Sequence, residues 1–256
     1  MGRIIAIANQ KGGVGKTTTA INLAAYLAAN EIEVLLVDMD PQGNSTTGVG
    51  IQKEPGMPTI YDVLSGAADP ATVIRPTEFD GLSLIPADKN LVAANLELVE
   101  NDHREFLLRK ALQPLAAKYQ YILIDCPPAL DLLTLNSMVA AESILIPIQC
   151  EFFALEGISQ LVDTIERLKA SIHPELRIEG ILLTMFDDRT NLARQVANDL
   201  QEFFQDEVFK TVIPRSIRLA EAPSYGKPIL AYDVRSKGSE SYIKLAKEII
   251  SRDQLS

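Results

Sequence analysis

A glycine-rich segment near the start of the chain has the residue types and spacing of a phosphate-binding loop. Residues 11–18 read Lys-Gly-Gly-Val-Gly-Lys-Thr-Thr, between the apolar run 4–8 and a helix-like stretch at 19–27. The glycines permit a tight turn in which backbone N–H groups and the helix N-terminus face one anion. A glycine-rich turn without a ligand is the disfavoured alternative, because the motif requires this strand-to-helix position. The predicted loop comprises Lys11, Gly12, Gly13, Val14, Gly15, Lys16, Thr17 and Thr18.

Three side chains of the loop have separate expected roles. Lys16 is placed to contact the β- and γ-phosphates of a bound polyphosphate, and the Thr17 hydroxyl to ligate a phosphate-bound Mg²⁺. The general motif has glycine at the position of Gln10, whereas this chain continues with a second lysine, Lys11. Lys11 has no phosphate left to bind in its own chain but could reach the nucleotide of a partner across a two-fold axis. The alternative is a solvated loop lysine.

Three carboxylates end predicted strands, where ligands bind in parallel sheets. Asp125 directly follows the apolar run 121–124 and is expected to face the Mg²⁺ of the loop. Asp38 and Asp40 end the run 34–40, and the period of two places both on one face. The Pro-Gln-Gly-Asn that follows suits a nucleotide-sensing switch. The alternative for each acid is a helix N-cap, but three acids beside a phosphate loop favour a site.

Strand-like and helix-like patterns alternate along the whole chain. Several strands, such as 122–124 and 144–146, are apolar on both faces, which is typical of a parallel sheet covered by helices on both sides. We therefore predict an α/β fold with a mostly parallel twisted sheet. The predicted strands are 3–8, 34–40, 82–87, 121–126, 143–149, 178–185, 208–213 and 228–232, and the predicted helices are 16–29, 89–117, 131–141, 154–172, 190–205 and 238–252.

Composition predicts one domain in a reducing compartment. The 256 residues are 47% apolar, and no linker-like stretch divides them, so we expect a single domain over residues 1–256. No run of about 18 apolar residues exists, and the chain enters a strand without a charged-then-apolar leader, so neither a membrane span nor a secretory signal is expected. Cys126 and Cys150 each end an apolar run and are interpreted as core residues. We expect a cytoplasmic protein.

Five sequence blocks together resemble one family. The chain is similar, nearly end to end, to the ParA/Soj chromosome-partitioning ATPases of the deviant Walker A superfamily, and more distantly resembles MinD and the nitrogenase iron protein. The resemblance implies a P-loop NTPase-like fold and an ATPase that uses ATP and Mg²⁺ and forms a homodimer around two ATP molecules. It also implies non-specific binding of double-stranded DNA by the dimer, slow hydrolysis stimulated by a ParB (Spo0J)-type partner in chromosome or plasmid partition, and a nucleoid-associated location. The blocks are 9–18, 37–44, 124–128, 149–157 and 212–224.

The resemblance also implies roles for individual residues. Lys11 matches the signature lysine that acts in trans, Lys16 the phosphate-binding lysine, and Asp40 the acid that positions the attacking water. The implied metal site comprises Thr17 and Asp125, with Asp38 supporting it through water. A segment that packs on the nucleotide base is implied at Pro214, Arg215 and Ser216, although many members of the family have Asn in place of Ser216.

The charge distribution allows DNA binding despite a net charge of −10. From Phe209 onward there are nine basic and five acidic residues, a local charge of +4, which leaves −14 on the rest of the chain. Phosphate contacts depend on a local patch rather than on net charge. By resemblance, Arg189 and Arg218 match arginines assigned to DNA contact. Weaker candidates, each equally well explained as a solvated cation, are Lys227, Arg235, Lys237 and Lys247.

Other ATPases with the same loop provide alternative interpretations. A MinD-like membrane-cycling ATPase needs a basic amphipathic helix after the last domain helix, where only a few residues follow. An iron–sulfur relative needs interface cysteines, and the two cysteines at strand ends do not suit that role. A small-molecule kinase or ATP-dependent synthetase remains an alternative enzyme; its turnover would respond to substrate rather than to DNA.

Overall fold

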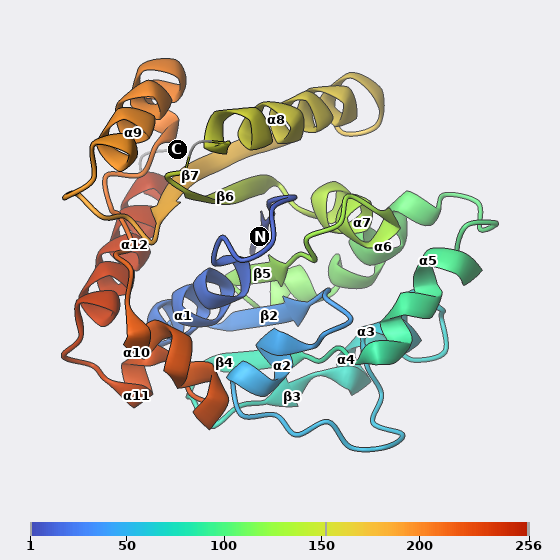
Figure 1. Ribbon diagram of the computed structural model, residues 1–256. Helices are drawn as coiled ribbons and strands as arrows, with labels where there is room; N and C mark the ends of the chain where they lie inside the picture. Colours follow the sequence, from blue (N-terminus) through green and yellow to red (C-terminus); the bar gives the residue numbers. More distant parts are fainter. Residues whose placement is uncertain (1, 152, 255–256) are drawn as a thin grey trace.

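The computed structural model describes residues 2–151 and 153–254, in which one sheet of seven strands lies between two layers of helices (Figure 1). Its order is β3-β4-β2-β5-β1-β6-β7, and every neighbouring pair is parallel except β3 and β4. The predicted mostly parallel α/β fold is confirmed. The strands are β1 (Arg3–Ile7), β2 (Val34–Asp38), β3 (Arg75–Pro76), β4 (Leu82–Ile85), β5 (Tyr121–Asp125), β6 (Ser143–Gln149) and β7 (Arg177–Thr184).

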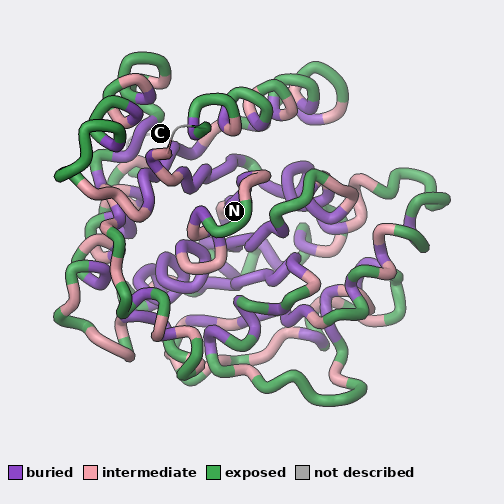
Figure 2. The backbone as a smooth tube through the Cα atoms, viewed as in Figure 1, coloured by how far each residue is buried: buried purple, intermediate pink, exposed green. Residues whose placement is uncertain are grey.

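The central strands are buried on both faces, as their continuous apolar sequences require. In β1, Ile4 and Ala6 join one hydrophobic cluster, and Ile5 and Ile7 join the other on the opposite face. Figure 2 shows these strands buried, with exposed residues mostly on the outer helices and loops.

Two sets of helices cover the sheet. The first face packs against α1 (Lys16–Ala28), α10 (Ile217–Glu221), α11 (Ile229–Tyr232) and α12 (Lys237–Asp253). The second face packs against α3 (Ile60–Leu64), α4 (Pro70–Val73), α5 (Ala94–Glu97), α6 (Leu107–Leu112), α7 (Leu132–Ala140), α8 (Ala154–Ser171) and α9 (Asn191–Phe204). A further short helix, α2 (Asn44–Gly48), follows β2, and 3₁₀ turns are η1 (Lys89–Ala93), η2 (Arg104–Phe106), η3 (Leu115–Ala117), η4 (Gln205–Glu207) and η5 (Ala222–Tyr225).

The predicted strand 208–213 is not formed, although the segment runs beside β7. An isolated bridge joins Val208 to Ile181 of β7, and the N–H groups of Phe209 and Ile213 donate to β7 carbonyls. Just beyond the two segments, a second bridge joins Pro214 to Phe186. The Glu248 carboxylate of α12 accepts hydrogen bonds from the backbone N–H groups of Lys210 (2.8 Å) and Thr211 (3.0 Å). These amides are therefore directed to a helix side chain rather than to a strand ladder.

The predicted strand 228–232 is wrong, because the segment forms α11. The Pro228 carbonyl accepts hydrogen bonds from the N–H groups of Ala231 and Tyr232, which closes a helical turn. The Asn22 side chain of α1 accepts from the Ile229 N–H at 2.7 Å. A short apolar run does not distinguish a strand from a helix, and here a tertiary contact selects the helix.

The helix predicted over 89–117 is divided into α5, α6 and three 3₁₀ turns. His103 has φ of +58°, and this left-handed residue ends any continuous helix before η2. The sequence patterns also missed the short elements α2, α3, α4, α10 and β3. Phe152, within the 149–157 block, lies outside the described residues, as do Met1 and residues 255–256 of the predicted domain. No helix in the described parts of the chain combines the length and apolarity needed to cross a membrane.

Candidate nucleotide-binding site

The predicted loop connects the end of β1 to the start of α1 and leaves open space in front of its glycines. Gly13 and Gly15 have φ of +75° and +93°, a region that strains other residues. A Cβ atom added at Gly12 or Gly13 would meet no atom within 4 Å. The loop therefore has the turn and the free volume that a bound phosphate requires.

Side chains from neighbouring strands hold the loop in place. Asn9 accepts a hydrogen bond from the Lys11 N–H (2.9 Å) and donates from Nδ2 to the Pro147 carbonyl (2.8 Å). The Thr184 hydroxyl donates to the Val14 carbonyl at 2.7 Å. The loop backbone is thus tied to β6 and β7, and its N–H groups are arranged before any ligand arrives.

Lys16 is a largely buried cation at the start of α1. Its side chain reaches back so that Nζ donates to the Lys11 carbonyl at 3.1 Å, and the residue is 7% exposed. Burial lowers the pKa of Lys16 below its ordinary value, and the nearby Asp125 and Asp40 carboxylates oppose that change. An anionic ligand in the loop would add counter-charge to this buried lysine.

Asp125 and Asp38 end neighbouring strands and lie side by side. They are partners in the β2–β5 register, and both are completely buried. Burial, followed by the charge of Asp38, raises the pKa of Asp125 to about 8, while hydroxyl contacts from Ser45 and Thr17 lower it. Ser45 Oγ donates to Asp125 Oδ2 at 2.8 Å, whereas the buried Oδ1 atom has no hydrogen-bond partner among the described residues.

Asp38 is held by the helix that follows the predicted switch. Its Oδ2 atom accepts hydrogen bonds from the Thr46 N–H (2.8 Å) and hydroxyl (2.7 Å). Burial is the main reason that the pKa of Asp38 rises to about 6, and these hydrogen bonds act against it. Ser45 and Thr46 were missed by sequence reasoning, because nothing in the pattern pairs hydroxyls of α2 with acids of two strands.

The residues present fit a Mg²⁺ ion bound mainly through phosphate. Asp125 Oδ1 is a buried carboxylate oxygen that no described residue hydrogen-bonds, and the Thr17 hydroxyl lies near the same carboxylate. Mg²⁺ prefers oxygen ligands and keeps several waters and phosphate oxygens around it. The described residues contain no group of three His, Cys, Asp or Glu side chains that would bind a metal without a ligand's help.

Asp40 lies just beyond β2, at the rim of the same site. Its N–H donates to Asp38 Oδ1 at 3.2 Å, and its own Oδ1 accepts from the Gln42 N–H at 2.9 Å. The helices that follow these strands have other N-caps: Gly43 for α2 and Asp131 for α7. None of the three acids is therefore the N-cap residue of these helices, although Asp38 accepts the Thr46 N–H in the first turn of α2.

The second lysine of the loop points to an acid of its own chain. Lys11 Nζ lies 2.6 Å from Glu151 Oε2, and both side chains are partly exposed. Glu151 follows β6 and belongs to the 149–157 block. Sequence reasoning identified this block but did not predict that Glu151 contacts Lys11. Lys11 is thus neither a freely solvated cation nor a ligand of its own phosphate site in this structure.

A cavity of about 230 Å³ beside the loop is suited to a nucleotide base. Gly15 and Thr18 line one side, and Pro214 and Ser216 of the predicted base segment line another. Ser216 Oγ caps α10 by accepting from the Leu219 N–H. Arg215 is exposed and is not among the lining residues. Sequence reasoning missed the lining residues Thr184, Met185, Ile213, Leu219, Ala220 and Tyr242.

The two stronger DNA candidates are exposed arginines paired with acids of their own chain. Arg189, in the loop after β7, forms a two-pronged hydrogen bond to Asp187 (2.8 and 2.7 Å) and lowers the pKa of Asp187 to about 2. Arg218, on α10, contacts Glu221 at 3.0 Å and Asp233 at 3.5 Å.

The weaker DNA candidates follow α10 in the chain, in the loops around α11 and along α12. In Figure 1, the loop between β7 and α9 lies along the edge formed by α10, α11 and α12. The bridge between Phe186 and Pro214 joins the two segments. Lys227 and Arg235 lie in loops and Lys237 begins α12, all exposed, whereas Lys247 lies ten residues further along α12, about 15 Å away.

Comparisons with known proteins give similarity over nearly the full chain. A family model described as an AAA domain matches residues 2–178. The chain is 55% identical over 253 residues to the chromosome partitioning protein ParA of Myxococcus xanthus, covering 99% of this chain and 89% of that one. It is 53% identical to the sporulation initiation inhibitor protein Soj of Bacillus subtilis, with coverage of 97% and 98%.

A solved structure supports the same fold. The cobyrinic acid a,c-diamide synthase of Mycobacterium smegmatis, described with bound ADP and magnesium, superposes with a TM-score of 0.87. It is 34% identical, and the match covers 99% of this chain and 96% of that one.

Proposed function

The chain belongs to the ParA/Soj family of chromosome-partitioning ATPases, and from this membership we propose that it binds ATP with Mg²⁺, dimerises, and then binds DNA without sequence preference. The observation that carries the proposal is the combination of a phosphate loop beginning with Lys11 and a buried acid pair, Asp38 and Asp125, beside it. The 55% identity to a chromosome partitioning ParA protein supports the biological role. We assign this function to the whole chain as one domain.

The chemistry at the loop would consist mainly of positioning and charge neutralisation. Loop N–H groups and the buried Lys16 would hold the phosphates, as Mg²⁺ bound by Thr17 and Asp125 neutralises part of their charge. Asp38 would support that position, since its carboxylate is fixed beside Asp125. Asp40, at the rim, would orient the water that attacks the terminal phosphate, and hydrolysis would be slow without a partner.

Dimerisation would complete the site. Lys11 would leave Glu151 and contact the phosphates of the partner subunit's nucleotide, exchanging one anion for a more highly charged one. A ParB-type partner would stimulate hydrolysis and so end the dimer state. The cavity lined by Pro214 and Ser216 would hold the base.

DNA binding would use the side of the molecule formed by α10, α11 and α12. Arg189 and Arg218 are exposed there, with Lys227, Arg235, Lys237 and Lys247 as additional phosphate contacts. The same chain has a net charge of −10, so the patch of one subunit would bind weakly. Two patches brought together by ATP would bind much more strongly, which would place the cytoplasmic protein on the nucleoid.

A small-molecule synthetase is the second candidate, because the solved relative described above is a diamide synthase at 34% identity. Identity to the partitioning proteins is higher, which favours the first proposal. A MinD-like membrane role has less support, since Tyr242, Leu245 and Ile249 of α12 are buried in the core rather than free to contact lipid.

The ATPase rate tests the proposal. We expect a slow rate that rises with DNA and a ParB-type protein together, and that is indifferent to small carboxylic acids plus glutamine. Stimulation by such substrates, with no effect of DNA, would favour the synthetase.

A further inference from the structure

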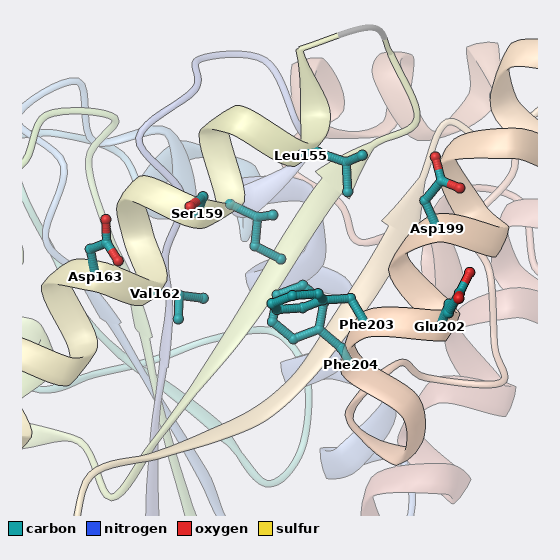
Figure 3. Close-up of a pocket in the computed structure, with 9 residues that line it drawn as sticks. Leu155, Ser159, Val162, Asp163, Asp199, Glu202, Phe203 and Phe204 are labelled. Carbon is teal, nitrogen blue, oxygen red and sulfur yellow. The ribbon is translucent and has the colours of Figure 1, made fainter.

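A groove between α8 and α9 exposes apolar side chains away from the nucleotide site. Figure 3 shows Leu155 and Val162 of α8 and the ring pair of Phe203 and Phe204 on α9 around this groove, whose volume is about 750 Å³. Phe203 is 77% exposed, although it is one of the largest apolar side chains of the molecule. Exposed apolar surface that is gathered in one groove marks a contact site more often than scattered residues do.

The base of the groove belongs to the core, because Ile158 is buried and Val162 and Phe204 pack partly buried against the same cluster. Helix α8 packs on the sheet through a buried stripe that includes Leu161, Ile165 and Leu168, and Ile158 of this stripe also lines the groove. The groove is lined by the neighbouring stripe, at positions 155, 158, 159, 162 and 163, whose spacing of three and four residues keeps it on one side of the helix. The outer part of the groove, with Leu155 38% exposed and Phe203 77% exposed, is left uncovered by the described residues.

The walls of the groove favour a helical occupant. Both walls are helices, whose backbone N–H and C=O groups are used internally, so no free strand edge is available to an extended peptide. The Phe203 and Phe204 rings meet edge to face, 4.8 Å apart between centroids, and form a rigid apolar wall. An amphipathic helix lays its apolar face into grooves of this kind.

Charge determines which kind of helix would fit. Three of the nine lining residues are acidic, namely Asp163, Asp199 and Glu202, and none of the nine is basic. These carboxylates lie at the edges of the apolar surface (Figure 3). An occupant with Lys or Arg beside its apolar stripe would be complementary, whereas an acidic one would be repelled.

We propose that the α8–α9 groove is the docking site for a basic amphipathic helix of a protein partner. Its apolar face covers Phe203 and Val162, and its basic side chains meet Asp199 and Glu202. The site also has a direct connection to the loop, because α8 begins three residues after Glu151, the acid that holds Lys11. A consequence for hydrolysis rests on the proposed ATPase function, but the binding step does not.

The test uses synthetic helical peptides and the nucleotide-free full chain, so that its result is independent of ATP hydrolysis. One probe of about 18 residues, the length of α8, has Leu at positions i, i+3, i+4 and i+7 and Lys elsewhere. A second probe replaces every Lys with Glu. We expect fluorescence anisotropy to detect binding of the Lys peptide only, and we expect that binding to weaken as salt increases.

Matched variants distinguish the groove from the general acidity of the chain. Phe203→Ala should weaken the Lys peptide about tenfold, as truncating a central aromatic anchor does. The control Leu96→Ala changes a residue that is 78% exposed on another surface and should have no effect. Asp199→Lys with Glu202→Lys should weaken binding at least about tenfold, and Glu100→Lys should not. Because these side chains are exposed or at the surface, melting temperatures should stay within a few degrees of the parent.

Two results would overturn the proposal. One is equal binding of the Lys peptide to the parent, Phe203→Ala and charge-reversed proteins, which would mean non-specific attraction to an acidic protein. The other is a dimer of the nucleotide-free parent, seen by light scattering, that Phe203→Ala abolishes. That result would mean that a second copy of this chain, and not a basic helix, covers the groove.

Discussion

The rim of the sheet that carries the phosphate loop and the side that carries the arginines hold their charged groups in opposite ways. At the rim, Lys16, Asp38 and Asp125 are buried, and hydrogen bonds from the backbone and from α2 fix them in place. On the other side, Arg189 and Arg218 are exposed and paired with nearby acids. The first region is arranged for a ligand in a single subunit, whereas the second holds its cations in weak local pairs.

The difference indicates how one region can control the other. Ion pairs between solvated side chains are weak, so a DNA phosphate can replace Glu221 or Asp187 at little cost, but each contact also adds little affinity. Binding then depends on how many contacts are made at once. Nucleotide bound at the rim would double the number of phosphate contacts by joining two subunits. Mutations at the rim should therefore affect ATP binding and dimerisation, whereas mutations of the arginines should affect DNA binding alone.

The largest effect is expected at the rim. Lys16→Ala removes the buried cation that faces the phosphates and should weaken ATP binding at least about 100-fold. Dimerisation and DNA binding should be lost with it. Isothermal titration calorimetry with ATP and Mg²⁺ measures the loss, with the exposed Lys89→Ala as the matched control. Tight ATP binding by Lys16→Ala would contradict the assignment of the loop.

A change at Asp40 should separate binding from hydrolysis. Asp40→Ala removes the group proposed to orient water but no phosphate contact, so hydrolysis should fall about 100-fold or more at unchanged ATP affinity. The ATP dimer should then persist, and light scattering measures its mass. A monomeric Asp40→Ala protein with ATP bound would mean that this acid has another role.

In the proposed mechanism, the Lys11–Glu151 pair acts after ATP binding at the rim and before DNA binding, at the dimerisation step. Lys11→Ala should bind ATP within about threefold of the parent yet remain monomeric, because the trans contact is lost. Glu151→Gln should instead dimerise at a lower protein concentration, since Lys11 no longer has to leave an anion. Sedimentation velocity with ATP compares the three proteins. Equal dimerisation of all three proteins would show that Lys11 is a surface lysine without a role in trans.

A smaller effect concerns stability of the nucleotide-free protein. The folded-state pKa of Asp125 is raised from 3.8 to about 8, so the ionised carboxylate opposes folding; this penalty is absent below about pH 4 and complete above about pH 8. Asp125→Asn should therefore raise the melting temperature in EDTA by several degrees at pH 8, with little gain near pH 4.

The same variant should lose the stabilisation that ATP and Mg²⁺ give the parent. A lower melting temperature for Asp125→Asn at pH 8 in EDTA would show that burial does not destabilise the charged form.

Sequence patterns predicted the rim better than the periphery, for a physical reason. Strands such as 121–125 are apolar at every position and end in an acid, so both their burial and the location of Asp125 follow from the sequence. Segment 228–232 has a similar apolar run but forms a helix whose first N–H, that of Ile229, donates to the Asn22 side chain. This contact joins residues 207 positions apart. In segment 208–213 the amides of Lys210 and Thr211 likewise donate to the distant Glu248.

Partners of the functional side chains were harder to predict than the side chains themselves. Lys11 and Arg218 are recognisable from the blocks that contain them, but the acids that hold them, Glu151 and Asp233, are fixed by tertiary placement. The groove between α8 and α9 was not predicted for the same reason. Its apolar residues come from two helices whose separate sequence patterns read only as ordinary amphipathic surfaces.

DNA affinity measured with ATP, with ADP and without nucleotide tests the central claim most directly. Fluorescence anisotropy with a labelled duplex, repeated at several salt concentrations and with a second unrelated sequence, gives both affinity and salt slope, which is about −0.9 per phosphate contact. We predict binding only with ATP, a steep slope, no dependence on sequence, and loss of binding in an Arg218→Glu protein that still dimerises. Equal DNA binding without nucleotide, or undiminished binding by Arg218→Glu, would contradict the account.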